Sequence, residues 1–345
     1  MNCESLGQDH RQFTLDDKVA AMRDPRSYAA DETATVTAIE THFAWVFLTD
    51  RYAYKLKKPI NYQMIDLRAL PARRANCERE IVLNRRLAPQ VYLGTIPLTH
   101  PHEQALRVGP GGEIVDWLVW MKRIPAHCML DVAMKRGNVP AKSLDDVGAM
   151  LAHFYASQPA VITEPRSYLG SLEQFQQCEF DELRSVDLRL DRKRVRDAAF
   201  ATSRAFERAR MELGERARAG RVVDGHGDLR PEHISLAQPV AVIDALEISD
   251  ALRVLDAARE LAFLWTECSV AGRDLIGESI FRHYERHRSD RVSDELMGFY
   301  RSCSALTRAK LTAWHLRDPL YRDLAPWGEL AERYLQFAEH SAHAN

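Results

Sequence analysis

The first third of the chain alternates hydrophobic and polar positions with a period of two, which is typical of β-strands. In the segment YAYKLK at 52–57, two tyrosines and a leucine alternate with an alanine and two lysines. The pattern predicts three consecutive strands within 33–58 and further strands near 93–99, 104–108 and 114–121. Between these groups we predict a helix over 71–87, because Pro71 suits a first helical turn and Pro89 follows the end.

From about residue 141 the hydrophobic residues recur three and four positions apart, which predicts helices. Ser143 is the predicted N-cap of the first of them. The other helical segments cover 172–218, 254–269, 273–288, 293–316 and 328–342, and a short β region occupies 222–244. A helix at 14–23, capped by Thr14, precedes the strands. Strands followed by helices in this way indicate an α+β fold with a small antiparallel β-rich lobe and a larger, mainly helical lobe.

Length and charge narrow the class of protein. The 345 residues exceed one average domain. The expected parts are a helical N-terminal extension at 1–31, an N-lobe at 32–121, a hinge at 122–125 and a helical C-lobe at 126–345. The 47 basic and 49 acidic residues nearly balance, which disfavours a general polyanion binder. Arginines within 184–221 alternate with acidic residues, so we expect an ion-paired helix face there.

The cysteines and the hydropathy of the chain predict its cellular compartment. No run reaches the ~18 apolar residues of a membrane helix, and residues 1–12 contain no signal-peptide core. The 6 cysteines are scattered without a CxxC pair, which favours reduced thiols over a disulfide or zinc framework. We therefore expect a cytoplasmic protein with neither a nucleic-acid nor a membrane partner. No pattern indicates its oligomeric state.

The segment from 224 to 247 carries the densest set of titratable side chains, in the sequence DGHGDLRPEHISL followed by VAVIDALE. The apolar runs ISL and VAVI read as strands, and the Ala-Gln-Pro between them reads as a turn. Such a hairpin would bring Asp244 back beside His233 and close to Asp228. Proton- or metal-handling side chains would then converge in one place.

The octapeptide HGDLRPEH at 226–233 resembles the catalytic loop of aminoglycoside phosphotransferases, a branch of the protein-kinase-like fold. Upstream, YAYK at 52–55 resembles the lysine motif of the third kinase strand, and VWMKRIP at 119–125 resembles the fifth strand and hinge. The whole combination is similar to an uncharacterised bacterial group of such proteins, many of which carry a P-loop ATPase domain after the kinase-like part. This chain lacks the P-loop motif, so we expect the stand-alone form.

The resemblance implies a phosphotransferase that moves the γ-phosphate of ATP or GTP to a hydroxyl group of a small molecule, with Mg²⁺ or Mn²⁺. Asp228 would orient the attacking hydroxyl, and Arg230 would stabilise charge on the transferring group. Asp244 would hold the metal, together with His233. His233 occupies the position where these enzymes carry asparagine, although Mg²⁺ prefers oxygen ligands.

In the N-lobe, the resemblance assigns Lys55 to the nucleotide phosphates and pairs it with a glutamate of the following helix. That helix offers Glu78 and Glu80. Glu80 shares a helix face with apolar residues, so it is the expected inward-pointing partner.

Adenine would meet backbone groups of the hinge near Lys122 and Ile124, beside Met121. The glycine-rich phosphate loop of protein kinases is absent, since residues 40–44 read Glu-Thr-His-Phe-Ala. His42 or backbone amides of that turn would cover the phosphates instead.

Two other functions stay open. The missing glycine loop and His233 are compatible with a nucleotide-binding pseudokinase or regulatory module. A metal hydrolase would use a set of four residues, namely His226, Asp228, His233 and Asp244. The kinase-like order of Lys55, a helix glutamate and a hinge argues against the hydrolase, which needs none of them.

Structural roles are expected for several neighbouring polar residues. His226 is predicted to brace the catalytic loop through hydrogen bonds, and Asp256 is predicted to brace it from the segment that follows. Arg308 and Lys310 are predicted either to reach the substrate or to form ion pairs between helices.

Overall fold

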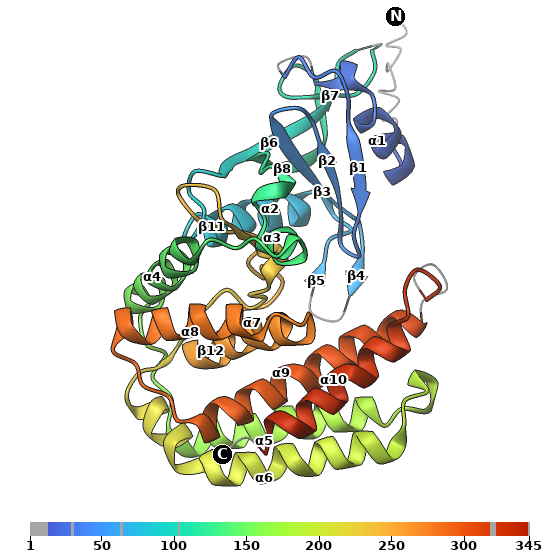
Figure 1. Cartoon of the computed structure of the whole chain (residues 1–345). Helices are drawn as coiled ribbons and strands as arrows, with labels where there is room; N and C mark the ends of the chain where they lie inside the picture. The colour runs from blue at the N-terminus through green and yellow to red at the C-terminus, as the bar shows by residue number, and fades with distance from the viewer. Residues whose placement is uncertain (1–12, 29–30, 63–64, 103, 318–321, 344–345) are drawn as a thin grey trace, which may run out of the picture. The chain divides into compact units, whose positions relative to one another are not determined.

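The computed structural model describes residues 13–28, 31–62, 65–102, 104–317 and 322–343 (Figure 1). The chain divides into two compact units, Met1–Ile124 and Pro125–Asn345. Strands dominate the first unit and helices the second, so the predicted α+β class is confirmed. Cys3 lies outside the described residues, and the five described cysteines have free thiols.

A six-stranded antiparallel sheet forms the first unit, in the order β1-β2-β3-β8-β6-β7. Its strands are β1 (Thr37–Glu40), β2 (Ala44–Leu48), β3 (Tyr52–Lys57), β6 (Tyr92–His100), β7 (Arg107–Val108) and β8 (Glu113–Lys122). A separate hairpin contains β4 (Asn61–Tyr62) and β5 (Ile65–Asp66). The predicted strands are all present, and the alternation in β3 gives the sheet two chemically different faces.

Helix α1 (Leu15–Met22) packs against the apolar face. Thr14 caps it in a reciprocal pair with Asp17, as its sequence predicts. Val19 and Met22 join Tyr54 and Leu56 of β3 in one buried core. The helix therefore belongs to the same compact unit as the sheet.

Helix α2 (Leu70–Asn84) packs against β8 and β6. Pro71 lies in its first turn, where a missing N–H costs nothing. Its buried residues recur three and four positions apart, which is the spacing of one helix face. Lys55 and Lys57 of β3 contact this helix through Glu80, so the second face of the sheet carries an ion-paired cluster.

The second unit is a packed set of helices (Figure 1). They are α3 (Leu130–Arg136), α4 (Ala141–Ser157), α5 (Pro165–Leu183), α6 (Arg192–Arg218), α7 (Ala257–Val270), α8 (Asp274–Arg288), α9 (Asp294–Trp314) and α10 (Trp327–Ser341). Helix α4 packs on α8, while α5, α6, α9 and α10 lie side by side. Within the described part of the chain, no helix is long and apolar enough to cross a membrane.

Helix α4 begins two residues earlier than its expected cap. Pro140 occupies the N-cap position with φ −64°, and Ser143 is buried inside the first turn. The Ser143 N–H donates to the Pro140 carbonyl at 3.0 Å, so Ser143 already belongs to the first helical turn. The prediction of Ser143 as N-cap is therefore wrong.

Short strands and 3₁₀ turns connect the helices of the second unit. The strands are β9 (Val222–Asp224), β10 (Ile234–Ser235), β11 (Ala241–Val242) and β12 (Val254–Asp256). The 3₁₀ turns among the described residues of both units are η1 (Pro25–Ser27), η2 (Ala126–Cys128), η3 (Val186–Leu188), η4 (Pro231–His233) and η5 (His315–Arg317). Antiparallel pairing of β10 with β11 confirms the predicted hairpin, and β12 pairs with β9.

Candidate functional site

In the first unit, two lysines of β3 converge on one buried glutamate of α2. Lys55 Nζ lies 3.0 Å from Glu80 Oε1, and Lys57 Nζ contacts Glu80 Oε2. The Glu80 side chain is 0% exposed, whereas that of Lys55 is 13% exposed and that of Lys57 1%. Lys55 is the more exposed of the two cations, so its ammonium group is the more accessible to an anionic ligand.

The choice of Glu80 over Glu78 follows from helix periodicity. Glu80 lies seven residues after Arg73 and three after Cys77, both buried on the face that packs on the sheet. Glu78 points the other way and pairs with Arg74 at 2.8 Å on the surface. Sequence reasoning did not assign Lys57, although the period of two places it on the same face as Lys55.

The residues proposed to meet the purine base lie at the end of β8. Met121 is buried and pairs with Ala53 of β3 in the strand register. The Lys122 N–H donates to the carbonyl of Val91 at 2.8 Å, so this amide is already engaged. Ile124 is the last residue of the first unit. A contact of these residues with a base stays a prediction.

The turn between β1 and β2 is closed by Thr41. Its N–H donates to the Ala44 carbonyl at 2.8 Å, and its hydroxyl accepts from the Ala44 N–H at 3.1 Å. His42 is exposed at the tip of this turn. A side chain thus closes the turn that glycines form in protein kinases, and phosphate binding by His42 stays a prediction.

In the second unit, the hairpin brings together the side chains that its sequence predicts. Asp228 Oδ2 lies 3.0 Å from Arg230 Nη2 and 3.8 Å from His233 Nδ1. Asp244 Oδ2 lies 3.7 Å from His233 Nε2. Arg230 also contacts Glu232, with Nη1 at 2.7 Å from Oε1. A cation therefore lies directly between two carboxylates of the loop.

Asp244 fits the role of a metal ligand. Its carboxylate is 43% exposed, and hard divalent cations bind one or two carboxylates while keeping several waters. Its φ is +64°, a left-handed conformation that is uncommon for residues other than glycine and recurs at functional sites. Among the described residues, no three His, Cys, Asp or Glu side chains are grouped closely enough to hold a metal without other ligands.

His226 holds the loop together from its buried core. Its Nε2 lies 2.9 Å from the Ile243 carbonyl, which only accepts, so Nε2 carries the proton. Nδ1 then accepts from the Asp228 N–H at 3.3 Å. Burial lowers the pKa of His226 to about 4, so the ring is neutral at pH 7. The predicted bracing role is confirmed.

Glu260, rather than Asp256, braces the loop from the following helix. Glu260 accepts from the N–H groups of His226 and Gly227 and from the Tyr155 hydroxyl. Asp256 instead caps α7 and binds Arg216 through both oxygens, at 2.6 and 2.8 Å. The register of β12 places Asp256 opposite Val222, away from the loop, and Glu260 lies one helical turn further on. The expectation for Asp256 is therefore wrong.

Gly227 is required by the close packing of this loop. Its φ is +89°, and a Cβ there would lie 2.9 Å from both Arg253 Cγ and Leu246 Cβ. Arg253 is itself 2% exposed. Its Nε lies 2.8 Å from Asp224 Oδ1, and its Nη1 lies 2.7 Å from the Leu246 carbonyl oxygen. No sequence signal predicts that Arg253 is buried here, because most arginines are exposed.

Other charged residues of the second unit have structural partners. Arg308 Nε lies 3.0 Å from Glu267, and Lys310 Nζ lies 2.5 Å from Glu179, so both form ion pairs between helices. Along α6, ion pairs such as Arg210 with Glu173 at 2.7 Å confirm the expected ion-paired helix face.

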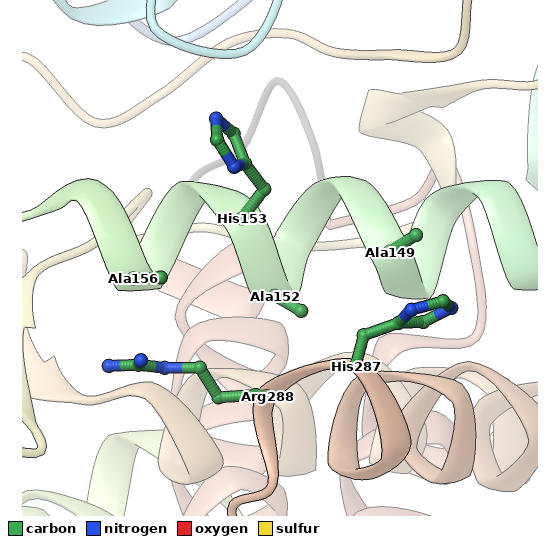
Figure 2. A pocket seen from close by; sticks show the side chains of 6 residues that line it. All are labelled: Ala149, Ala152, His153, Ala156, His287 and Arg288. Carbon is green, nitrogen blue, oxygen red and sulfur yellow. The ribbon is translucent and has the colours of Figure 1, made fainter.

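A cavity of about 290 Å³ between α4 and α8 lies apart from the loop (Figure 2). Its lining residues are Ala149, Ala152, His153, Ala156, His287 and Arg288. Figure 2 shows that His153 extends away from His287 and Arg288. The polar groups do not converge, so this cavity is not the candidate site.

Comparison with known sequences identifies uncharacterised relatives of the chain. No family model matches the chain. The chain is 29% identical over 275 residues to uncharacterised proteins of Mycobacterium bovis and Mycobacterium tuberculosis. The match covers 79% of this chain and 53% of each relative, so the chain spans about half the length of the curated relatives it matches.

Solved structures of small-molecule kinases are similar to the chain. Choline kinase from Cryptosporidium parvum has a TM-score of 0.50 at 10% identity, over 95% of this chain and 94% of that chain. A choline/ethanolamine kinase family protein from Mesorhizobium loti has a TM-score of 0.49 at 16% identity, over 95% and 100%. Aminoglycoside 2'-phosphotransferase-IIIa has a TM-score of 0.49 at 14% identity, over 88% and 93%. The chain has the protein-kinase-like fold, and at these identities the likeness concerns the fold alone.

Proposed function

We propose that the chain is a phosphotransferase that moves the γ-phosphate of ATP or GTP to a hydroxyl group of a small molecule. The observation that carries the proposal is the loop of the second unit, where Asp228, Arg230 and Asp244 gather around His233. A phosphotransferase needs a carboxylate near the acceptor, a metal-binding carboxylate and cations for the phosphates, and it needs little covalent chemistry. The kinase-like fold supports the same assignment.

Each residue has a distinct role in this proposal. Asp228 accepts a hydrogen bond from the acceptor hydroxyl and orients its oxygen for attack. Arg230 balances negative charge beside Asp228, and Lys55 binds the nucleotide phosphates while Glu80 holds it in place. Asp244 would hold Mg²⁺ or Mn²⁺, which neutralises phosphate charge when bound. The purine base would contact the segment from Met121 to Ile124.

The acceptor is a small molecule with a hydroxyl group. The choline kinase with the same fold is, by its name, a kinase of such a compound. Arg230 lies against the two carboxylates of Asp228 and Glu232, so these three side chains together carry a net negative charge. Such a charge disfavours a strongly anionic acceptor.

A nucleotide-binding module without turnover is the second candidate. It is favoured by the β1–β2 turn, which Thr41 closes in place of a glycine-rich phosphate loop. A metal hydrolase is disfavoured, because both ring nitrogens of His226 are engaged by the backbone and cannot also bind a metal.

A thermal-shift panel tests the proposal. The full chain is melted with ATP, GTP, their diphosphates and a pyrimidine triphosphate, each with Mg²⁺ or Mn²⁺, and phosphate release is then followed with candidate alcohols. Purine nucleotide stabilisation with alcohol-dependent turnover supports the kinase. Stabilisation without turnover supports the second candidate, and no stabilisation by any nucleotide contradicts both.

A further inference from the structure

The hydrogen bonds of His233 define its tautomer. Nδ1 lies 2.8 Å from the backbone carbonyl of Asp228, which only accepts, so Nδ1 carries a proton. Nε2 lies 3.2 Å from Arg230 Nη2, which only donates, so Nε2 is the acceptor. The ring is therefore a neutral imidazole whose single lone pair already receives a guanidinium N–H.

This lone pair is the only one through which the ring could bind a metal. Asp244 Oδ2, at 3.7 Å from Nε2, lies beyond hydrogen-bond distance, so Arg230 is the closer partner of this nitrogen. The side chain of His233 is 8% exposed, and its backbone carbonyl accepts from the Ile243 N–H at 2.9 Å. The ring is thus fixed beside Arg230 by the hairpin.

Arg230 is held by three groups at its two terminal nitrogens. Nη2 lies 3.0 Å from Asp228 Oδ2 and 3.2 Å from His233 Nε2, and Nη1 lies 2.7 Å from Glu232. An asparagine at position 233 would end one atom short of Nε2, so it could not reach Arg230 in this way. The histidine adds a contact that the usual kinase residue does not offer.

We propose that His233 is a positioning residue that holds Arg230 against Asp228. Of the two predicted metal ligands, Asp244 binds the metal and His233 does not. The proposal rests on the phosphotransferase function and changes the role of the residue at the asparagine position. It predicts that His233 acts on turnover through Arg230 and leaves metal affinity unchanged.

A double-mutant cycle tests this coupling. His233→Asn is expected to lower turnover about tenfold and Arg230→Ala about 10²-fold, the range for losing one oriented donor. The double variant is expected to match Arg230→Ala, because His233 has nothing left to position. The proposal would be overturned if the losses of turnover in the two single variants multiplied in the double variant. It would also be overturned by a more than tenfold rise in the half-saturating Mg²⁺ concentration in His233→Asn.

His233→Gln is the matched control. The glutamine amide oxygen lies as many bonds from Cβ as His233 Nε2 and can accept the same hydrogen bond from Arg230. Turnover is therefore expected within about threefold of the parent. A glutamine variant as slow as the asparagine variant, with an unchanged melting temperature, counts against positioning.

A spectroscopic measurement separates this proposal from the proposed function. Nitrogen-15 spectra of the histidine-labelled, metal-free full chain report the tautomer of His233. The His233 signal is assigned as the one that disappears in His233→Asn or His233→Gln. Protonated Nδ1, with an Nε2 shift that changes in Arg230→Ala, supports the proposal even if no acceptor is found. Protonated Nε2 overturns it even if the chain is an active kinase.

Discussion

Replacing Lys57 with methionine removes one of the two ammonium groups that contact the buried Glu80 carboxylate. Lys57 is 1% exposed, so water cannot take its place in the wild-type geometry. Lys55 remains 3.0 Å from Glu80 and prevents an isolated buried charge. The variant therefore tests whether Lys57 is the structural partner of Glu80 while Lys55 serves the ligand.

The magnitude follows from burial. A hydrogen bond to a charged group contributes about 1.5–3 kcal/mol, and breaking a fully buried pair costs about 3–5 kcal/mol. Because Glu80 keeps one cation, we expect Lys57→Met to lower the free energy of unfolding by about 2–3 kcal/mol. Lys55→Met leaves the buried Lys57–Glu80 pair intact and removes the more exposed cation, so it is expected to cost less, about 1–2 kcal/mol. At ~2–4 °C per kcal/mol, Lys57→Met is expected to melt about 4–12 °C lower than the parent.

Urea unfolding and calorimetry of the full chain measure the difference, with each transition fitted separately because the chain has two compact units. Lys58→Met is the matched control, since Lys58 pairs at 2.6 Å with the exposed Glu40 and should change stability little. Nucleotide-induced stabilisation is expected to vanish in Lys55→Met and to persist in Lys57→Met. Equal destabilisation by the two variants, or loss of nucleotide response only in Lys57→Met, would contradict the separate roles of the two lysines.

Three further outcomes are expected. Gly227→Ala should destabilise the chain in urea by about 1–3 kcal/mol, because its φ is +89° and the new Cβ meets Arg253, whereas Gly272→Ala, at φ +74° with nothing within 4 Å, should cost less. Burial lowers the pKa of His226 from 6.5 to about 4, so the unfolded state binds a proton that the folded state excludes. Stability should then fall by up to about 3 kcal/mol between pH 6.5 and 4 and stay flat above, and a pH profile unchanged in His226→Gln would contradict this. Asp244→Ala should abolish the Mg²⁺ dependence of nucleotide binding in calorimetric titrations, and a retained dependence would remove Asp244 from the metal site.

Local patterns in the sequence were sufficient to predict the strands and the hairpin that follows the loop at 226–233. The period of two in β3 predicts which side chains face α1 and which face α2, because neighbouring strands impose the alternation. The apolar runs around the turn at 237–239 likewise predict the hairpin that returns Asp244 to His233. These features depend on residues close together in the chain.

Contacts between distant segments were not predictable in the same way. Glu260 reaches His226 and Gly227 only because β12 pairs with β9 and sets the start of α7. The guanidinium of Arg253 is buried where it contacts Asp224 at the end of β9 and the Leu246 carbonyl, which lie 22 residues apart in the chain. The burial of Lys57 depends on the packing of α2 against the sheet, which no propensity of the lysine itself indicates.

Transfer of a labelled γ-phosphate tests whether the chain is a phosphotransferase that uses Asp228. The parent chain and Asp228→Asn are incubated with Mg²⁺, γ-labelled ATP or GTP and a pool of small alcohols, and the products are resolved by mass spectrometry. We expect label on an acceptor hydroxyl with the parent and a rate ~10²–10⁴-fold lower with Asp228→Asn, the range for a positioned general base. Nucleotide affinity should change little, because Lys55 and Asp244 are intact. Equal transfer by the two proteins would contradict the assigned mechanism, and label found on no acceptor with either protein would contradict the kinase function.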